Sequence, residues 1–147
     1  MPDTLRLPTA CHEEIIVWCQ RQYPKEACGI LAGAGGGVVQ VYPMTNVEDS
    51  PIGYAMDPKE QLRVERDMRQ RGQRMVGVFH SHTASAAYPS SVDVSLAISA
   101  DLSYVLVSLK DREHPDVKSY RIDGTTITPE DVSVGPDPAG PGWIGAA

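Results

Sequence analysis

Cysteine is scarce in this chain of 147 residues, which contains only Cys11, Cys19 and Cys28. The number is odd and no two of them form a C-x-x-C pair, which argues against a disulfide framework and against a thiolate zinc site. A chain of this length buries roughly 68–70% of the surface that its unfolded form exposes, so a stable core does not need disulfides. We therefore expect reduced thiols in one soluble globular domain.

Long hydrophobic runs are absent as well. No stretch approaches the ~20 consecutive apolar residues of a membrane-spanning helix. The N-terminal sequence MPDTLRLPTA lacks the charged and then apolar order of a secretory signal peptide. Both absences predict a cytoplasmic protein with no membrane partner.

Positive charge is in the minority, with 13 Lys and Arg against 19 Asp and Glu and a formal net charge of −6. An acidic chain is a poor candidate for non-specific nucleic-acid binding, so we expect no nucleic-acid partner. Residues 59–74, KEQLRVERDMRQRGQR, are the exception, because they carry +3 and leave −9 for the remainder. This stretch is either a basic helix face for an acidic partner or a solvated helix with i,i+4 pairs such as Glu65–Arg69.

The order of the predicted elements indicates a mixed α/β or α+β fold with helices packed on a sheet. Thr9 is the expected cap of the first helix and Gly72 closes the second. No repeat or linker divides the chain. We expect one domain over residues 1–128. The Pro/Gly-rich tail, residues 129–147, is expected to be extended or mobile. The patterns predict helices over 10–22, 58–71 and 91–99, and strands over 28–42 around a glycine turn, 54–56, 75–82, 103–109, 117–123 and 125–128.

The segment most informative about chemistry is 80–93, HSHTASAAYPSSVD. His80 and His82 are two residues apart at the end of an apolar strand, so both imidazoles leave the same face. Asp93, in the first turn of the next helix, can bring a carboxylate to the same point. Two imidazoles and one carboxylate suit zinc, and three protein ligands leave one tetrahedral position open, as catalytic zinc sites do. An H-x-H pair alone also occurs by chance on surface strands.

This segment resembles the signature of the JAMM (MPN-plus) metallopeptidase family, H-x-H-x7-S-x2-D, at His80, His82, Ser90 and Asp93. The family also requires an upstream glutamate, which Glu26 in PKEACGILAG matches. The resemblance covers nearly the whole chain, and the phrases EACGILAG, PMTN, YVLVS and SYRI are similar to a bacterial branch of the family. It implies a single JAMM/MPN-like domain with a mixed, mostly antiparallel, curved sheet and a cytidine-deaminase-like architecture.

The resemblance also implies the roles of two further residues. Glu26 would be the general base that passes a proton to the leaving amine, whereas without the signature it would be a solvated glutamate beside Lys25. Ser90 would donate to the oxyanion of the tetrahedral intermediate. A helix N-cap is the competing role for Ser90, and we assign the cap to Ser91 on the view that one hydroxyl cannot serve both uses.

The substrate expected from the bacterial branch is a ubiquitin-like (β-grasp) sulfur-carrier protein whose C-terminal Gly-Gly is joined to cysteine by an amide bond. Three alternatives stay open: an isopeptidase that removes ubiquitin-like modifiers from lysines, a non-catalytic zinc-containing module that binds the carrier, and a structural metal. Thr83, where deubiquitinases of the family commonly have proline, argues against the first. Tyr88-Pro89 either lines the substrate channel or packs within its loop. Cys28 is expected to be a core residue rather than a nucleophile. A homodimer is left open.

Overall fold

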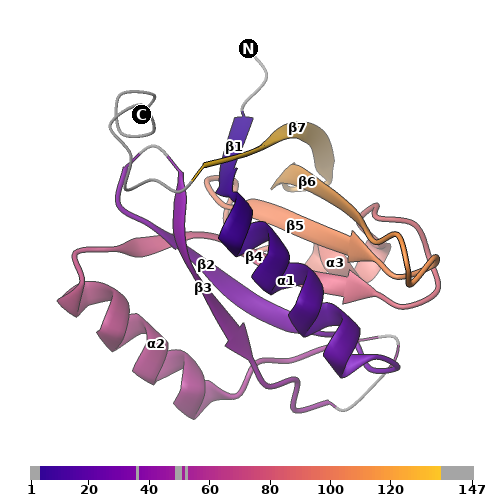
Figure 1. The fold of residues 1–147 in the computed structure, drawn as a ribbon, viewed down its shortest axis with the longest axis horizontal. Coiled ribbons are helices and arrows are strands. Elements are labelled where there is room, and N and C mark those ends of the chain that lie inside the picture. The colour runs from indigo at the N-terminus through magenta and orange to yellow at the C-terminus, as the bar shows by residue number, and fades with distance from the viewer. Residues whose placement is uncertain (1–3, 36, 49–50, 52, 137–147) are drawn as a thin grey trace.

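The computed structural model describes residues 4–35, 37–48, 51 and 53–136. Within these ranges a single sheet carries three helices (Figure 1). The strand order is β1-β7-β6-β5-β4-β2-β3. The elements are β1 (Thr4–Pro8), α1 (Thr9–Gln22), β2 (Cys28–Gly33), β3 (Val38–Met44), α2 (Pro58–Gln70), β4 (Arg74–His82), α3 (Ser91–Leu96), β5 (Ser103–Ser108), β6 (Asp116–Asp123) and β7 (Thr126–Gly135).

The sheet is mixed and mostly antiparallel, as predicted. β1 pairs with β7 and β4 pairs with β5 in parallel, while the other neighbouring strands are antiparallel. The sheet also curves: its two edge strands, β1 and β3, come close enough to share one hydrophobic cluster. The shared residues are Leu5, Leu7, Val38 and Val41. No helix in the described ranges is long and apolar enough to cross a bilayer.

Apolar side chains cover both faces of the sheet. On one face, Ile15 and Cys19 of α1 pack against Phe79 of β4. On the other face, Met68 of α2 packs against Met44 of β3, and α3 packs near β5 and β6. Because side chains alternate along a strand, β4 places Phe79 under α1 and its histidines on the face of α2 and α3.

Several predicted boundaries are wrong at the N-terminus and in the loops. The N-cap of α1 is Pro8, and the Thr9 hydroxyl instead donates to the carbonyl oxygen of Gly135 at 2.8 Å. Strand β1 was not predicted. The stretch 54–56 is not a strand, because only an isolated bridge joins Met56 to Asn46. The predicted helix 91–99 ends at Leu96.

The C-terminal strand is longer than the sequence suggests. Gly124, at φ 62°, makes the predicted turn between β6 and β7. β7 then continues through Gly135, pairing first with β6 and afterwards with β1. Residues 129–135, which the sequence assigns to the tail, are therefore part of the sheet, and residues 137–147 lie outside the described residues.

Candidate metal and catalytic site

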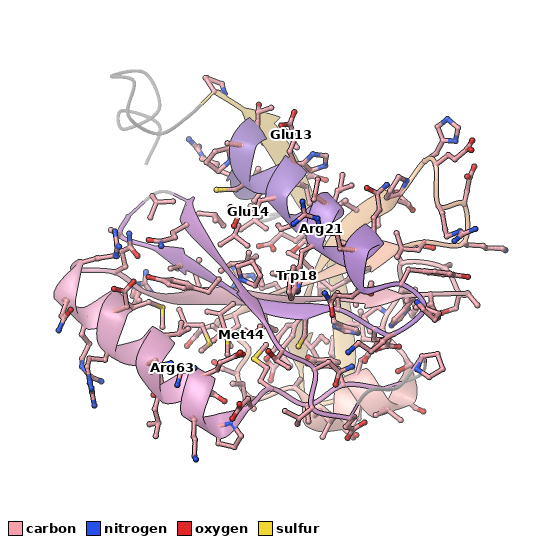
Figure 2. All side chains as sticks on the ribbon, turned by 60° about the horizontal axis from the view of Figure 1, so that its bottom comes forward. Glu13, Glu14, Trp18, Arg21, Met44 and Arg63 are labelled. Carbon is pink, nitrogen blue, oxygen red and sulfur yellow. The ribbon has the colours of Figure 1, made fainter. Side chains whose placement is uncertain are left out.

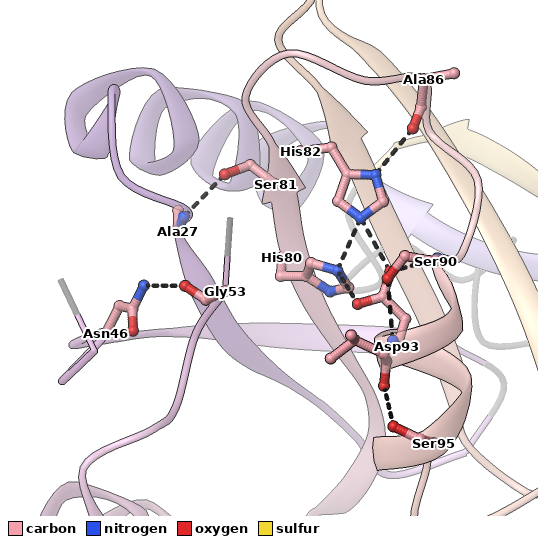
Figure 3. A network of polar contacts seen from close by, with 11 residues as sticks. Ala27, Asn46, Gly53, His80, Ser81, His82, Ala86, Ser90, Asp93 and Ser95 are labelled. Atoms are coloured by element: carbon pink, nitrogen blue, oxygen red, sulfur yellow. Dashed lines mark hydrogen bonds and ion pairs between the residues drawn. The ribbon is translucent and has the colours of Figure 1, made fainter. Parts of the chain in front are cut away.

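His80 and His82, at the end of β4, meet the carboxylate of Asp93 from α3. The two Nε2 atoms are 3.3 Å apart, and each lies 3.0 Å from a different oxygen of Asp93. Figure 3 shows the three side chains converging from the strand and from the first turn of the helix. All their ligand atoms lie within 4.8 Å of one another.

The spacing of these atoms fits a metal ion. Bonds of about 2.0–2.1 Å in tetrahedral geometry place neighbouring zinc ligands about 3.3 Å apart, which matches the Nε2–Nε2 distance of 3.3 Å. His82 Nδ1 lies 2.9 Å from the carbonyl oxygen of Ala86. Since a carbonyl only accepts, Nδ1 carries a hydrogen, and the hydrogen that Nε2 shares with Asp93 is the one that a metal ion would displace. The described residues can thus hold a metal through two imidazoles and one carboxylate.

The electrostatics keep an ionised carboxylate beside a neutral imidazole. Burial alone would raise the pKa of Asp93, but hydrogen bonds from His80 and His82 outweigh it and hold that pKa below its ordinary value. Burial lowers the pKa of His80. For His82, burial also acts to lower the pKa, yet its hydrogen bonds to Asp93 and Ala86 leave it raised.

Ser90 positions Asp93 through a capping box. Ser90, rather than Ser91, is the N-cap of α3: its hydroxyl accepts from Asp93 N–H at 3.1 Å. In return, Ser90 N–H donates to Asp93 Oδ2 at 2.9 Å. The predicted cap at Ser91 is therefore wrong, and the spacing S-x-x-D in the signature is itself a capping pattern that holds the carboxylate in place.

The two roles of Ser90 do not exclude each other. A hydroxyl accepts with its lone pairs and donates with its hydrogen. Ser90 accepts from Asp93 and lines the cleft described below, so its hydrogen stays available to a group bound there. The assumption that capping and donation compete for one hydroxyl was wrong on chemical grounds.

Glu26 reaches the same cleft from the chain before β2. Ser81 N–H donates to Ala27 O, and Ala27 N–H donates to Ser81 Oγ. These bonds continue the β2–β4 pairing past Cys28↔His80, which places Glu26 beside the histidine-bearing end of β4. The residue is buried, at 7% exposure. Burial raises the pKa of its carboxyl to about 7, with His82 lowering it and Asp93 and Glu48 raising it.

A cleft of about 410 Å³ lies over these groups. Glu26, His82, Ser90 and Asp93 all line it, so one space has access to two of the three metal-ligand candidates and to both candidate catalytic residues. His80 instead lines a small adjoining cavity of about 30 Å³, together with Asp93 and Tyr54. Among the described residues of the cleft wall there is no Lys or Arg. The remaining lining residues are Glu48, Pro51, Gly53, Tyr54, Thr83, Ala84, Ser85, Val92 and Leu96.

Two residues of the site were not predicted from the sequence. Tyr54 stacks on His80 with ring centroids 4.7 Å apart and lines the cleft. Asn46 is buried and donates to the carbonyl oxygens of Glu26 and Gly53, which fixes the loop beside the cleft. A single aromatic and a single amide in a polar loop carry no spacing pattern, so only the fold reveals them.

Two other residues considered from the sequence lie outside the cleft. Tyr88 packs edge-on against Tyr120, with ring centroids 5.4 Å apart, and does not appear among the described lining residues. Cys28 is fully buried in β2, and burial raises the pKa of its thiol to about 12. Tyr88 thus packs on β6 and Cys28 in the core, whereas Pro89 lines the small cavity of about 30 Å³ that also contains His80 and Asp93.

Comparisons with solved structures agree with this fold. A protein from Desulfitobacterium hafniense, solved in solution, is 37% identical, with a TM-score of 0.82 over 90% of this chain and 94% of that one. A JAB1/MPN domain protein from Archaeoglobus fulgidus has a TM-score of 0.60 over 88% of this chain and 98% of that one, at 17% identity. The second likeness shows the fold alone.

Sequence comparisons identify the family. The CysO-cysteine peptidase of Mycobacterium tuberculosis is 44% identical over 122 residues, which cover 82% of this chain and 84% of the relative. A desampylase of Pyrococcus furiosus is 38% identical over 69 residues, 47% of this chain and 49% of the relative. The sequence model of the protein family "Prokaryotic homologs of the JAB domain" matches residues 8–123 of this chain. The chain therefore belongs to the prokaryotic homologs of the JAB domain and is a hydrolase of the JAMM metallopeptidase type.

Proposed function

We propose that this chain is a zinc-dependent hydrolase that cleaves the amide bond between the C-terminal Gly-Gly of a ubiquitin-like sulfur-carrier protein and cysteine, releasing the cysteine. One observation carries the proposal: His82 and Asp93 of the His80–His82–Asp93 group share a cleft with Glu26, and burial raises the pKa of the Glu26 carboxyl to about 7. A general acid–base group works best when its pKa lies near the operating pH.

Each residue has one task in this proposal. His80, His82 and Asp93 hold zinc, which when bound supplies Lewis-acid polarisation and lowers the pKa of water. Glu26 accepts a proton from the attacking water and delivers it to the nitrogen of the departing cysteine. Ser90 donates its free hydroxyl hydrogen to the oxygen that becomes negative in the transition state.

The substrate class is supported by the names of the relatives. One is a CysO-cysteine peptidase, and another is a probable TtuB-protein conjugate cleaving protease from Thermus thermophilus, 33% identical over 63% of this chain. A Gly-Gly tail suits the site because residues without a Cβ allow the backbone to approach metal-bound side chains closely.

A lysine isopeptide of a ubiquitin-like modifier is the second candidate substrate. The described lining of the cleft has no Lys or Arg to pair with the α-carboxylate of a cysteine adduct. A lysine isopeptide has no carboxylate next to its scissile bond and would not need such a cation. This observation favours the alternative, as does the name of the desampylase relative.

The test compares three substrates at equal concentration with the zinc-loaded protein. They are a CysO–cysteine adduct, the same carrier joined to a lysine side chain, and an adduct whose last carrier glycine is replaced by alanine, with products identified by mass spectrometry. We expect the cysteine adduct to be cleaved fastest, the alanine adduct slowest, and a strong chelator to stop all cleavage. Faster cleavage of the lysine conjugate would replace cysteine release by modifier removal, and cleavage that resists the chelator would remove the zinc assignment.

A further inference from the structure

The outward face of α2 carries four arginine or lysine side chains. At 3.6 residues per turn, Lys59, Arg63, Arg66 and Arg69 fall within an arc of about 120°. All four are exposed, and Leu62, at 64% exposure, lies within the same arc. Figure 2 labels Arg63 on this helix, with Met44 of β3 between it and α1. We call these five residues the α2 basic face.

Two carboxylates of the same helix are turned to the sheet and bonded there. Asp67 accepts from the Tyr42 hydroxyl at 2.6 Å and from Arg71 Nε at 2.8 Å. Glu60 accepts from Thr45 N–H at 2.8 Å and from the Thr45 hydroxyl at 2.6 Å. These contacts hold two of the three carboxylates of α2 away from the basic face. The third, Glu65, lies at the edge of the face next to Arg69 and leaves the face with an excess of positive charge.

The cations of the basic face stay without a counter-charge. The ion pair that the structure shows on this helix is Asp67–Arg71, rather than the predicted Glu65–Arg69. Lys59, Arg63, Arg66 and Arg69 make no ion pair with any described residue. A solvated helix neutralised by i,i+4 pairs therefore does not describe this face.

The α2 basic face begins next to the cleft. Gly53 and Tyr54 line the cleft, and α2 starts at Pro58. Lys59, the first cation of the face, is thus five residues from the cleft wall. A folded protein whose C-terminal tail enters the cleft would have its body within reach of this helix.

We propose that the α2 basic face docks an acidic patch on the folded body of the ubiquitin-like conjugate, with exposed Leu62 as an apolar contact inside the ring of charges. The inference rests on the proposed function. It names a protein surface rather than a nucleic acid because the residues outside 59–74 carry −9 and would repel a polyphosphate. Attraction between exposed charges acts mainly on the association rate and is screened over ~8 Å at physiological salt.

The test uses Arg63→Glu/Arg66→Glu in the full-length, zinc-loaded protein. Its matched control is Arg21→Glu/Lys110→Glu, which makes the same change in net charge at exposed positions outside α2. The substrates are the CysO–cysteine adduct and a short peptide with the last residues of the carrier joined to cysteine. At low salt we expect the α2 variant to lose at least tenfold in kcat/KM for the folded adduct, with no change for the peptide and no change for the control variant on either. The loss should shrink towards threefold or less at high salt.

Three results would overturn the docking proposal: an unchanged kcat/KM of the α2 variant on the folded adduct, an equal loss on the peptide, or an equal loss in the control variant. Circular dichroism and melting temperature check that each variant is folded.

If the parent protein cleaves neither substrate, the proposed function fails. The affinity of parent and α2 variant for the intact adduct, measured by titration calorimetry, then decides the docking proposal by itself, and equal affinities or no affinity reject it. If the parent protein and the control variant bind duplex DNA and the α2 variant does not, the α2 basic face is a nucleic-acid-binding surface and the docking proposal is rejected.

Discussion

At the scale of single residues, Glu26 combines a buried position with a proposed proton transfer that needs its charge. Replacing it by glutamine keeps the shape but removes the proton acceptor. We expect Glu26→Gln to bind zinc as the parent does and to lose ~10²–10⁴ in turnover, the range typical of a general acid–base group. Metal analysis and steady-state kinetics check this. Turnover within threefold of the parent would place the proton transfer elsewhere.

The same substitution makes a prediction about stability and pH in the metal-free protein. Because burial raises the folded-state pKa of Glu26 from 4.5 to about 7, the folded state binds more protons than the unfolded state between these values. Stability contributed by this residue is therefore lost as pH rises through that window and stays lost above it. After discounting for solvent screening, we expect Glu26→Gln to raise the unfolding free energy above pH 7 by about 1–2 kcal/mol. Urea titrations of both proteins at pH 4.5 and 8 test this, and an equal gain at both pH values would contradict it.

Ser90 should show two separable effects. Ser90→Ala removes the cap of α3 and the free hydroxyl hydrogen together. We expect a loss of ~1 kcal/mol in stability and a fall in kcat of about 10²–10³ with little change in KM. Ser91→Ala, one residue on, should change neither quantity, since Ser91 does not cap. A loss of stability at Ser90→Ala with an unchanged kcat would leave Ser90 as a cap alone.

The site residues with fixed spacing were predictable from the sequence, Glu26 followed from the family resemblance, and Tyr54 and Asn46 were not predicted. His80, His82 and Asp93 come from one short segment, where strand alternation and a helix start suffice to bring them together. Tyr54 comes close to His80 only because the loop before α2 folds back on β4. A contact between distant segments leaves no periodic trace in a single sequence.

At the scale of elements, the loop before α2 depends on Asn46. Its amide donates to Glu26 O and Gly53 O, and its Oδ1 accepts from the backbone N–H groups of Glu48 and Ala55, at 2.9–3.1 Å. We expect Asn46→Asp to cost about 2–4 kcal/mol, because a carboxylate cannot donate and would face two carbonyl oxygens. Catalytic efficiency should fall with it, as Gly53 and Tyr54 line the cleft. Chemical denaturation and kinetics measure both, and the exposed neighbour Val47→Ala is the control.

Element prediction failed mainly where pairing partners are far apart in the chain. β1 and the second half of β7 pair in parallel across more than a hundred residues, Thr4 with Asp131. β1 has only five residues, and β7 contains Pro129, which lowers its strand signal. The central strands carry apolar runs, α1 has apolar residues at helical spacing, and α2 is bounded by Pro58 and Gly72, which explains why these elements were predicted.

At the scale of the whole molecule, the sheet gathers the site from three distant parts of the chain. Pairing of β2 with β4 brings Glu26 to the histidines, the loop between β3 and α2 supplies one wall, and α3 returns Asp93 to β4. Each contributing segment is attached to the central strands. The chemistry at the cleft thus depends on the integrity of the sheet.

At the other end of the sheet, β7 joins the edge strand β1 to β6, which makes the C-terminal boundary testable. Residues 131–135 of β7 pair with β1. Glu130, which is buried and pairs with β6, accepts from the Ser119 hydroxyl at 2.7 Å and from Arg121 Nε at 2.9 Å. Truncation after Thr128 removes these partners and leaves β1 without its neighbour, so we expect a loss of at least about 3 kcal/mol in unfolding free energy. Truncation after Pro136 keeps every described strand and should retain both stability and zinc-dependent hydrolysis. Equal urea midpoints for the two truncated proteins would mean that residues 129–135 add nothing to the domain, and the boundary would then lie at residue 128.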